Sequence, residues 1–144
     1  MPTKRLKNAS ARLTTRPIDT IQSALASHGA KAISLDYEQG QAIALAFVLD
    51  IGGDRHAFRM PARLQNVLIK LYGNRRVYTE TQRNQAYVTA WANIRDWVTA
   101  QLAMIDIGLV KMEEVFLPYM MISENKTVFD VYEQQQFQLK SGEK

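Results

Sequence analysis

The middle of this chain alternates apolar and polar residues, and this period of two constrains the fold more than any other feature. The alternation covers residues 33–37, 43–49 and 56–60. A period of two is typical of β-strands, whose successive side chains point to opposite faces. Turn residues occupy 38–41 and 52–54, between these runs. Because both connections are so short, we predict three strands in an antiparallel meander.

Apolar residues at helical spacing flank the strands. Pro17 opens one such segment, which extends to His28, and a second one covers residues 61–72. A longer segment covers 79–107, where Thr79 and Gln82 have the spacing of a capping box. Its apolar residues recur every three or four positions, so we predict a long helix with a broad buried face.

The predicted fold class is therefore α+β: a helix, a three-stranded meander, then several helices including one long central helix. The last apolar segment, near residue 128, favours a helix over a strand. We divide the chain into a flexible basic arm (1–16), a single α+β domain (17–133) and a frayed tail (134–144).

The composition is that of one globular domain. The chain has 144 residues, of which 47% are hydrophobic and 22% charged, and it has no cysteine. The absence of cysteine excludes disulfides and thiolate metal sites. No apolar run approaches the roughly 18 residues of a membrane-spanning helix, so we expect a soluble cytoplasmic protein.

Positive charge is concentrated in the first part of the chain. Residues 1–83 hold 13 Lys and Arg against 6 Asp and Glu, whereas residues 84–144 hold 5 against 8. Such a basic region attracts polyanions, and arginine favours bidentate contacts to phosphate or carboxylate. The candidate residues for binding nucleic acid or a partner are Lys4, Arg5, Lys7, Arg12, Arg16, Arg75, Arg76 and Arg83. An acidic protein surface and the absence of any specific role remain the alternatives.

The two tryptophans belong to the predicted long helix. Six residues separate Trp91 from Trp97, so the two side chains project about 120° apart on a helix. We expect Trp91 in the core and Trp97 at an edge. A possible subunit interface comprises Trp97, Phe116, Tyr119 and Met120.

No motif of catalytic chemistry stands out. The chain has two histidines, and neither has a serine or acidic residue at a recognisable catalytic spacing. The Gly52-Gly53-Asp54 sequence lacks the Lys-Ser/Thr of a phosphate-binding loop. We therefore expect no enzyme activity, no cofactor and no metal. One question stays open, which is whether the acidic residues near strand ends converge on a cation; they are Asp36, Glu38, Asp50 and Asp54.

The order of elements over residues 17–72 resembles the double-stranded-RNA-binding domain. In that family the second helix begins with a lysine-rich motif that contacts phosphates. The corresponding stretch here, 61–66, has Arg63 as its one cation. The resemblance therefore concerns topology.

A second resemblance spans roughly residues 18–132. It rests on two strings, Asp-Trp-Val-x-Ala-Gln at 96–101 and Glu-Val-Phe-Leu-Pro-Tyr at 114–119. The chain resembles a group of small bacteriophage and prophage proteins. The resemblance implies a phage accessory protein that works in the cytoplasm of the bacterial host and has no transferable catalytic residues. Such a protein would bind nucleic acid or a bacterial nucleic-acid-handling complex, and it could inhibit a host defence system such as a CRISPR effector. The alternatives are a structural or oligomeric accessory protein, and an accessory factor of DNA replication or recombination.

Overall fold

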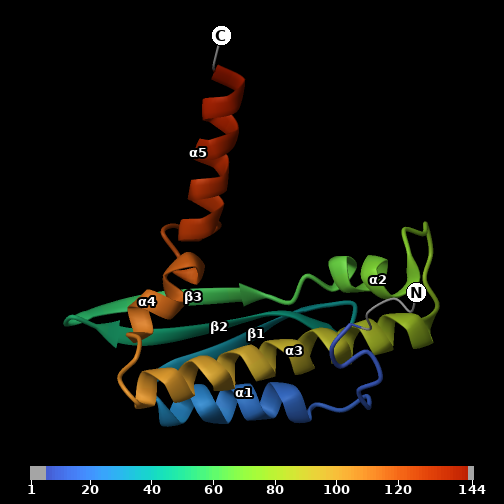
Figure 1. The fold of residues 1–144 in the computed structure, drawn as a ribbon, viewed down its shortest axis with the longest axis horizontal. Helices are drawn as coiled ribbons and strands as arrows, with labels where there is room; N and C mark the ends of the chain where they lie inside the picture. The colour runs from blue at the N-terminus through green and yellow to red at the C-terminus, as the bar shows by residue number, and fades with distance from the viewer. Residues whose placement is uncertain (1–5, 143–144) are drawn as a thin grey trace.

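The computed structural model describes residues 6–142 and has the α+β architecture that the sequence predicts (Figure 1). One helix precedes the three strands, and the other helices follow them. The elements are α1 (Arg16–Ser27), β1 (Ala32–Glu38), β2 (Gln41–Ile51), β3 (Asp54–Pro61), α2 (Leu64–Tyr72), α3 (Glu80–Asp106), α4 (Met112–Phe116), the 3-10 helix η1 (Leu117–Tyr119) and α5 (Val128–Gly142).

The strands form the predicted antiparallel meander, in the order β1-β2-β3. The first turn places Gln39 (φ 51°) and Gly40 (φ 79°) in the left-handed region, as a type I′ hairpin turn requires. The register shifts where Asp36 pairs with Ala44 and Tyr37 with Ala42, because β2 has one extra residue there. This bulge lies at the end of the sheet that meets the first half of α3.

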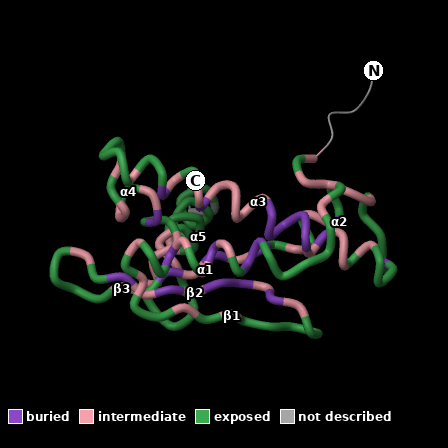
Figure 2. The backbone as a smooth tube through the Cα atoms, turned by 90° about the horizontal axis from the view of Figure 1, so that it is seen from below, coloured by how far each residue is buried: buried purple, intermediate pink, exposed green. Residues whose placement is uncertain are grey.

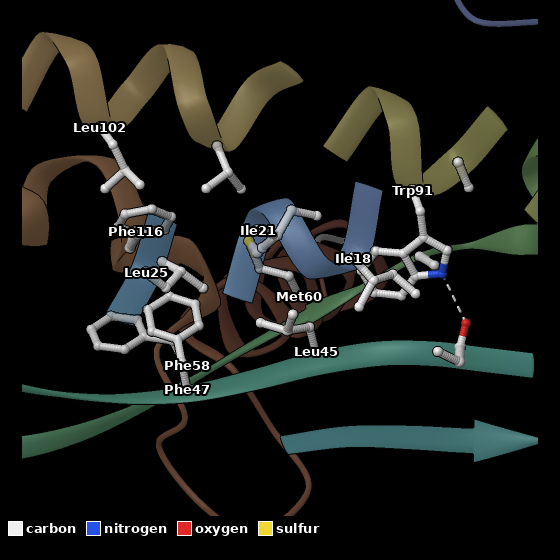
Figure 3. Packing of buried hydrophobic residues seen from close by; sticks show 14 of the residues in the cluster. Ile18, Ile21, Leu25, Leu45, Phe47, Phe58, Met60, Trp91, Leu102 and Phe116 are labelled. Atoms are coloured by element: carbon white, nitrogen blue, oxygen red, sulfur yellow. Dashed lines mark hydrogen bonds between the residues drawn. The ribbon is translucent and has the colours of Figure 1, made fainter. Parts of the chain in front are cut away.

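Helices α1 and α3 cover one face of the sheet (Figures 1 and 2). The buried cluster between them draws apolar side chains from both layers, as Figure 3 shows. Leu45 and Phe47 point from β2 toward Ile21 and Leu25 of α1. The opposite face of β2 carries Ala46 and other small residues, because side chains alternate along a strand.

Helix α3 begins at the predicted capping box. The Thr79 hydroxyl accepts a hydrogen bond from the Gln82 backbone N–H (3.1 Å), and the Gln82 side chain accepts one from the Thr79 N–H (2.9 Å). Both bonds satisfy backbone donors that the first turn leaves free. The tryptophans differ as predicted: Trp91 is 1% exposed, whereas Trp97 is half-buried.

The chain after α3 returns to the sheet and then leaves it. Met120 pairs with Phe58 in an isolated bridge, and the Met121 N–H donates to the Ala57 carbonyl (2.7 Å). Helix α5 then projects away from the rest of the molecule (Figure 1). Among the described residues, no helix is both long and apolar enough to cross a membrane.

The predicted frayed tail is helical as far as the structure describes it. Helix α5 continues to Gly142, well beyond Gln134 where we expected order to end. Its start has a reciprocal cap, because the Thr127 hydroxyl accepts from the Asp130 N–H (3.1 Å) and the Asp130 carboxylate accepts from the Thr127 N–H (3.0 Å). The glutamines that follow are good helix formers, which explains why the helix continues through them.

Candidate nucleic-acid or partner interface

The described part of the N-terminal arm lies along α3, although the sequence suggested a flexible segment. Three α3 side chains, here named the arm bracket, hold its backbone carbonyl groups. They are Gln85, whose Nε2 donates to Ala11 O (3.0 Å), Thr89, whose Oγ1 donates to Asn8 O (2.9 Å), and Asn93, whose Nδ2 donates to Lys7 O (2.8 Å). Their spacing of four residues puts them on one side of the helix.

Asp96 continues this line of contacts along α3. Its carboxylate accepts hydrogen bonds from Asn8 Nδ2 (3.0 Å) and pairs with Lys7 Nζ (3.1 Å) and Arg95 Nη2 (2.9 Å). Partial burial alone would raise the pKa of Asp96, but the hydrogen bonds from Asn8, Lys7 and Arg95 outweigh it and lower the pKa to about 2. The ionised carboxylate therefore anchors the arm.

Because Gln85 in the first turns of α3 binds the Ala11 carbonyl, the arm brings Arg12 close to the start of α3. The chain then turns back to α1, which begins beside the middle of α3 (Figure 1). The last turn of α2 and the loop 73–79 also lie near the start of α3. We call this region the basic end. Its described cations, all exposed, are Arg12, Lys70, Arg75, Arg76 and Arg83.

Hydrogen bonds fix the loop that carries Arg75 and Arg76. The buried Tyr78 hydroxyl donates to the Gly73 carbonyl (2.7 Å) and accepts from the Arg75 backbone N–H (3.1 Å). Arg83 Nη1 donates to the Tyr78 carbonyl (2.7 Å), which ties the loop to the first turn of α3. A loop held in this way loses little conformational freedom when its cations bind a ligand.

The cations of the basic end have no carboxylate partner among residues 6–142, because no ion pair there involves any of them. By contrast, Arg55 pairs with Asp50 (3.2 Å) and Arg59 pairs with Asp36 (3.1 Å). Unpaired arginines on a fixed scaffold can donate hydrogen bonds to phosphate oxygens or to carboxylates.

The sequence-based candidates for this surface separate into three groups. Lys4 and Arg5 lie outside the described residues. Lys7 lies beyond the basic end and pairs with Asp96, so it helps to hold the arm on α3. Arg16 also lies beyond the basic end, because α1 begins beside the middle of α3 (Figure 1). The rest belong to the segments that meet near the start of α3; they are Arg12, Arg75, Arg76 and Arg83.

Sequence reasoning missed two contributors to this region. Lys70 joins the basic end because α2 packs on α3. The arm bracket was also missed. The polar residues at 85, 89 and 93 recur every four positions, on the side of the long helix opposite its apolar stripe, and this pattern indicates a polar contact along that side.

Phe116 was the wrong choice for an interface, because it is 0% exposed within the protein's own core. Its ring contacts Phe47 (centroids 5.3 Å apart) and Trp97 (5.7 Å). Trp97 also contacts Tyr119 edge to face (5.8 Å). Trp97, Tyr119 and Met120 remain half-buried and accessible at their edges.

His28 forms a structural contact rather than a catalytic arrangement. Its Nδ1 lies 2.7 Å from the Ala24 carbonyl, and its Nε2 lies 2.9 Å from the Asp106 carboxylate. These two acceptors favour the imidazolium form and raise the pKa of His28. Ser27 Oγ, 3.3 Å from Nδ1, donates instead to the Ala24 carbonyl, so no activated nucleophile results. The pair joins the ends of α1 and α3.

The acidic residues near the strand ends do not converge. Asp36 and Asp50 pair with Arg59 and Arg55. Glu38 and Asp54 end β1 and begin β3 at opposite ends of the sheet. In the part of the chain that the structure describes, no three His, Asp or Glu side chains come close enough to hold a metal ion.

Comparison of the chain with protein-family models found no match. Comparisons with curated proteins and with solved structures also found none. The inference of function therefore rests on the basic end and on the sequence itself.

Proposed function

We propose that this protein is a non-enzymatic binding protein whose basic end contacts the phosphates of nucleic acid. One observation carries the proposal: exposed cations from the arm, α2, the loop 73–79 and α3 lie near the start of α3 and have no carboxylate partners among the described residues. By contrast, Arg55 and Arg59 in the sheet each form an ion pair with an aspartate. Cations left unpaired attract polyanions at long range and at contact.

The start of α3 supports an anionic ligand. Backbone N–H groups of its first turn create a positive partial charge, which adds to the field of Arg83 and Arg76. Glu80 and Asp19 are the acidic side chains nearest these segments in sequence, and both are exposed. The cations outnumber them, so the local balance is positive.

The resemblance to small phage proteins suggests where such binding would act. The protein would be a phage accessory factor that occupies nucleic acid, or the nucleic-acid groove of a bacterial complex, and thereby blocks a host defence such as a CRISPR effector. The mechanism is occlusion, which needs a fixed charged surface and no reacting group. An acidic surface of a protein complex is the competing ligand for the same arginines.

Fluorescence anisotropy with labelled single- and double-stranded DNA and RNA tests the proposal. Arg75→Gln should weaken binding about 3- to 10-fold at low salt and should reduce the slope of log affinity against log salt by about one. The matched control is Arg55→Gln, which removes the same charge from the β2–β3 turn and should leave affinity within twofold.

Two outcomes contradict nucleic-acid binding: no measurable affinity for any of these oligonucleotides, or affinity that does not depend on salt. The acidic-protein alternative would then predict a bacterial partner whose capture survives nuclease treatment. That capture should be lost in Arg75→Glu and retained in Arg55→Glu.

A further inference from the structure

Tyr37 is an aromatic side chain that the fold leaves open to solvent. It is 63% exposed, and among the described residues no aromatic side chain outside α5 is as exposed. It lies in β1, opposite Ala42 of β2. Because side chains alternate along a strand, Tyr37 points to the same face of the sheet as Ile33 and Leu35, which pack against the core. The sheet therefore fixes the direction of a ring that the core leaves uncovered.

A hydrogen bond holds the end of the sheet that carries Tyr37 against the first turns of α3. Gln41 Nε2 donates to Asn84 Oδ1 (3.3 Å), and Asn84 follows Arg83 in α3. Tyr87 lies one turn further along the helix. Burial raises the pKa of Tyr87, and the charge of the nearby Tyr37 phenol adds to this effect. Tyr37 therefore lies beside the basic end.

The acidic residues next to Tyr37 lie on the other side of the sheet. Asp36 and Glu38 flank Tyr37 in β1, so alternation directs both of them to the opposite face. Asp36 pairs there with Arg59 (3.1 Å). The face toward α3 thus combines an exposed ring with cations that have no carboxylate partner among the described residues.

Exposed apolar side chains also accompany the cations of the basic end. They are Leu13 (55% exposed), Ile69 (41%) and Val77 (76%), each adjacent in sequence to one of those cations. Phosphates need cations, whereas the faces of unstacked bases favour aromatic and apolar contacts. A duplex keeps those faces inside its stack and offers only base edges, in its grooves. The mixed surface therefore fits a single strand better than a duplex.

We propose that the nucleic acid is single-stranded and that the Tyr37 ring stacks on one of its bases. The inference rests on the proposed function and names the class of nucleic acid. The cations of the basic end bind the phosphates, while β1 holds the ring against the face of a base. Every base has such a face, so binding should depend little on the sequence of the strand.

Fluorescence anisotropy with a labelled single strand and with the duplex of the same sequence tests the proposal. The wild type should bind the single strand at least about threefold more tightly at the same salt concentration. Tyr37→Ala should weaken single-strand binding about 5- to 100-fold without changing the slope of log affinity against log salt, because the ring carries no charge. Tyr37→Trp should keep the affinity. Tyr132→Ala is the matched control: it removes an exposed tyrosine (56%) from α5 and should leave affinity within about twofold.

An abasic strand of the same length separates stacking from charge without any change to the protein. It keeps the phosphates and lacks the bases, so the wild type should bind it about 5- to 100-fold more weakly than the normal strand. In Tyr37→Ala the difference between the two strands should be much smaller.

Equal wild-type affinity for the normal and the abasic strand overturns the proposal, as does salt-dependent binding that prefers the duplex. The proposed function survives either result, because phosphate contacts alone would explain the binding. The absence of salt-dependent binding to every strand and duplex would instead overturn the proposed function itself, and stacking with it, and would leave an acidic protein surface as the ligand.

Discussion

The indole Nε1 of Trp91 donates a hydrogen bond of 3.0 Å to the carbonyl oxygen of Ala42. Ala42 lies beside the bulge where β2 has one residue more than β1. The bond therefore joins the middle of α3 to the irregular part of the sheet, inside the core (Figure 3). It gives the buried indole N–H an acceptor within the core.

Trp91→Phe should lower the free energy of unfolding by about 2–3 kcal/mol. The change leaves a cavity and removes the donor for the Ala42 carbonyl. Chemical denaturation followed by circular dichroism measures the loss. Trp97→Phe is the control, because Trp97 is only half-buried, and it should have the smaller effect. Equal losses would show that the Ala42 contact contributes little.

Asp96→Ala should release the N-terminal arm from α3. The substitution removes the acceptor that Asn8 and Lys7 share, and a charge-assisted contact of this kind contributes about 1.5–3 kcal/mol. Trypsin should then cleave after Lys7 and Arg12 at least several times faster. Asp106→Ala, which removes a carboxylate from the end of the same helix, should leave these cleavage rates unchanged.

The Asp96 carboxylate should also make the attachment of the arm to α3 sensitive to acid. The pKa of Asp96 is about 2 in the folded protein, against an ordinary value of 3.8. The stability that it contributes is therefore complete above about pH 4 and declines as the pH falls toward 2. The protection of the amides of residues 7–11 from hydrogen exchange, taken relative to the intrinsic exchange rate at each pH, should fall in this window in the wild type. In Asp96→Asn the fall over the same window should be smaller.

His28 should make stability depend on pH in the opposite direction. Its pKa is raised above 6.5 by the contacts with Ala24 and Asp106. The stabilisation is therefore fully present below pH 6.5 and is lost as the pH rises through the folded pKa. Thermal unfolding across pH 6–8.5 should show this decline, and His28→Gln should flatten it. His56→Gln, which removes the other histidine, should retain the decline.

Gln39→Asn should stabilise the first hairpin. Gln39 has a left-handed backbone (φ 51°) in a turn that strongly prefers asparagine before glycine. We expect the free energy of unfolding to rise by about 0.5–1 kcal/mol. Gln41→Asn, just past the same turn and in β2, should not raise it. A melting temperature unchanged by Gln39→Asn would contradict the expectation.

The parts of the fold that the sequence predicted are those decided by local patterns. The meander follows from alternation and two short turns, and α3 begins where Thr79 and Gln82 form a capping box. The cap of α5 at Thr127 and Asp130 was equally local. The polar run of glutamines that follows, 134–136, is typical of a tail and therefore favoured the wrong end for this helix.

The parts that the sequence could not predict depend on contacts between distant residues. Apolar spacing marked Phe116 for burial but could not say that Phe47 and Trp97 would be its neighbours. The arm likewise reaches Gln85 and Thr89 across more than seventy residues of sequence. The gathering of Arg12 with Arg75 at one end depends on these long-range bonds, so charge counts alone could only suggest it.

The attachment of the arm to α3 also has a practical consequence for labelling this protein. A fusion at the N-terminus would emerge from the arm, which lies along α3 and leads to the basic end, so this position is not neutral for measuring binding. A tag at the C-terminus would extend from α5, which projects away from the rest of the molecule (Figure 1). A dye placed beside the exposed β2–β3 turn, at Asp54→Cys for example, would report on binding without touching the basic end.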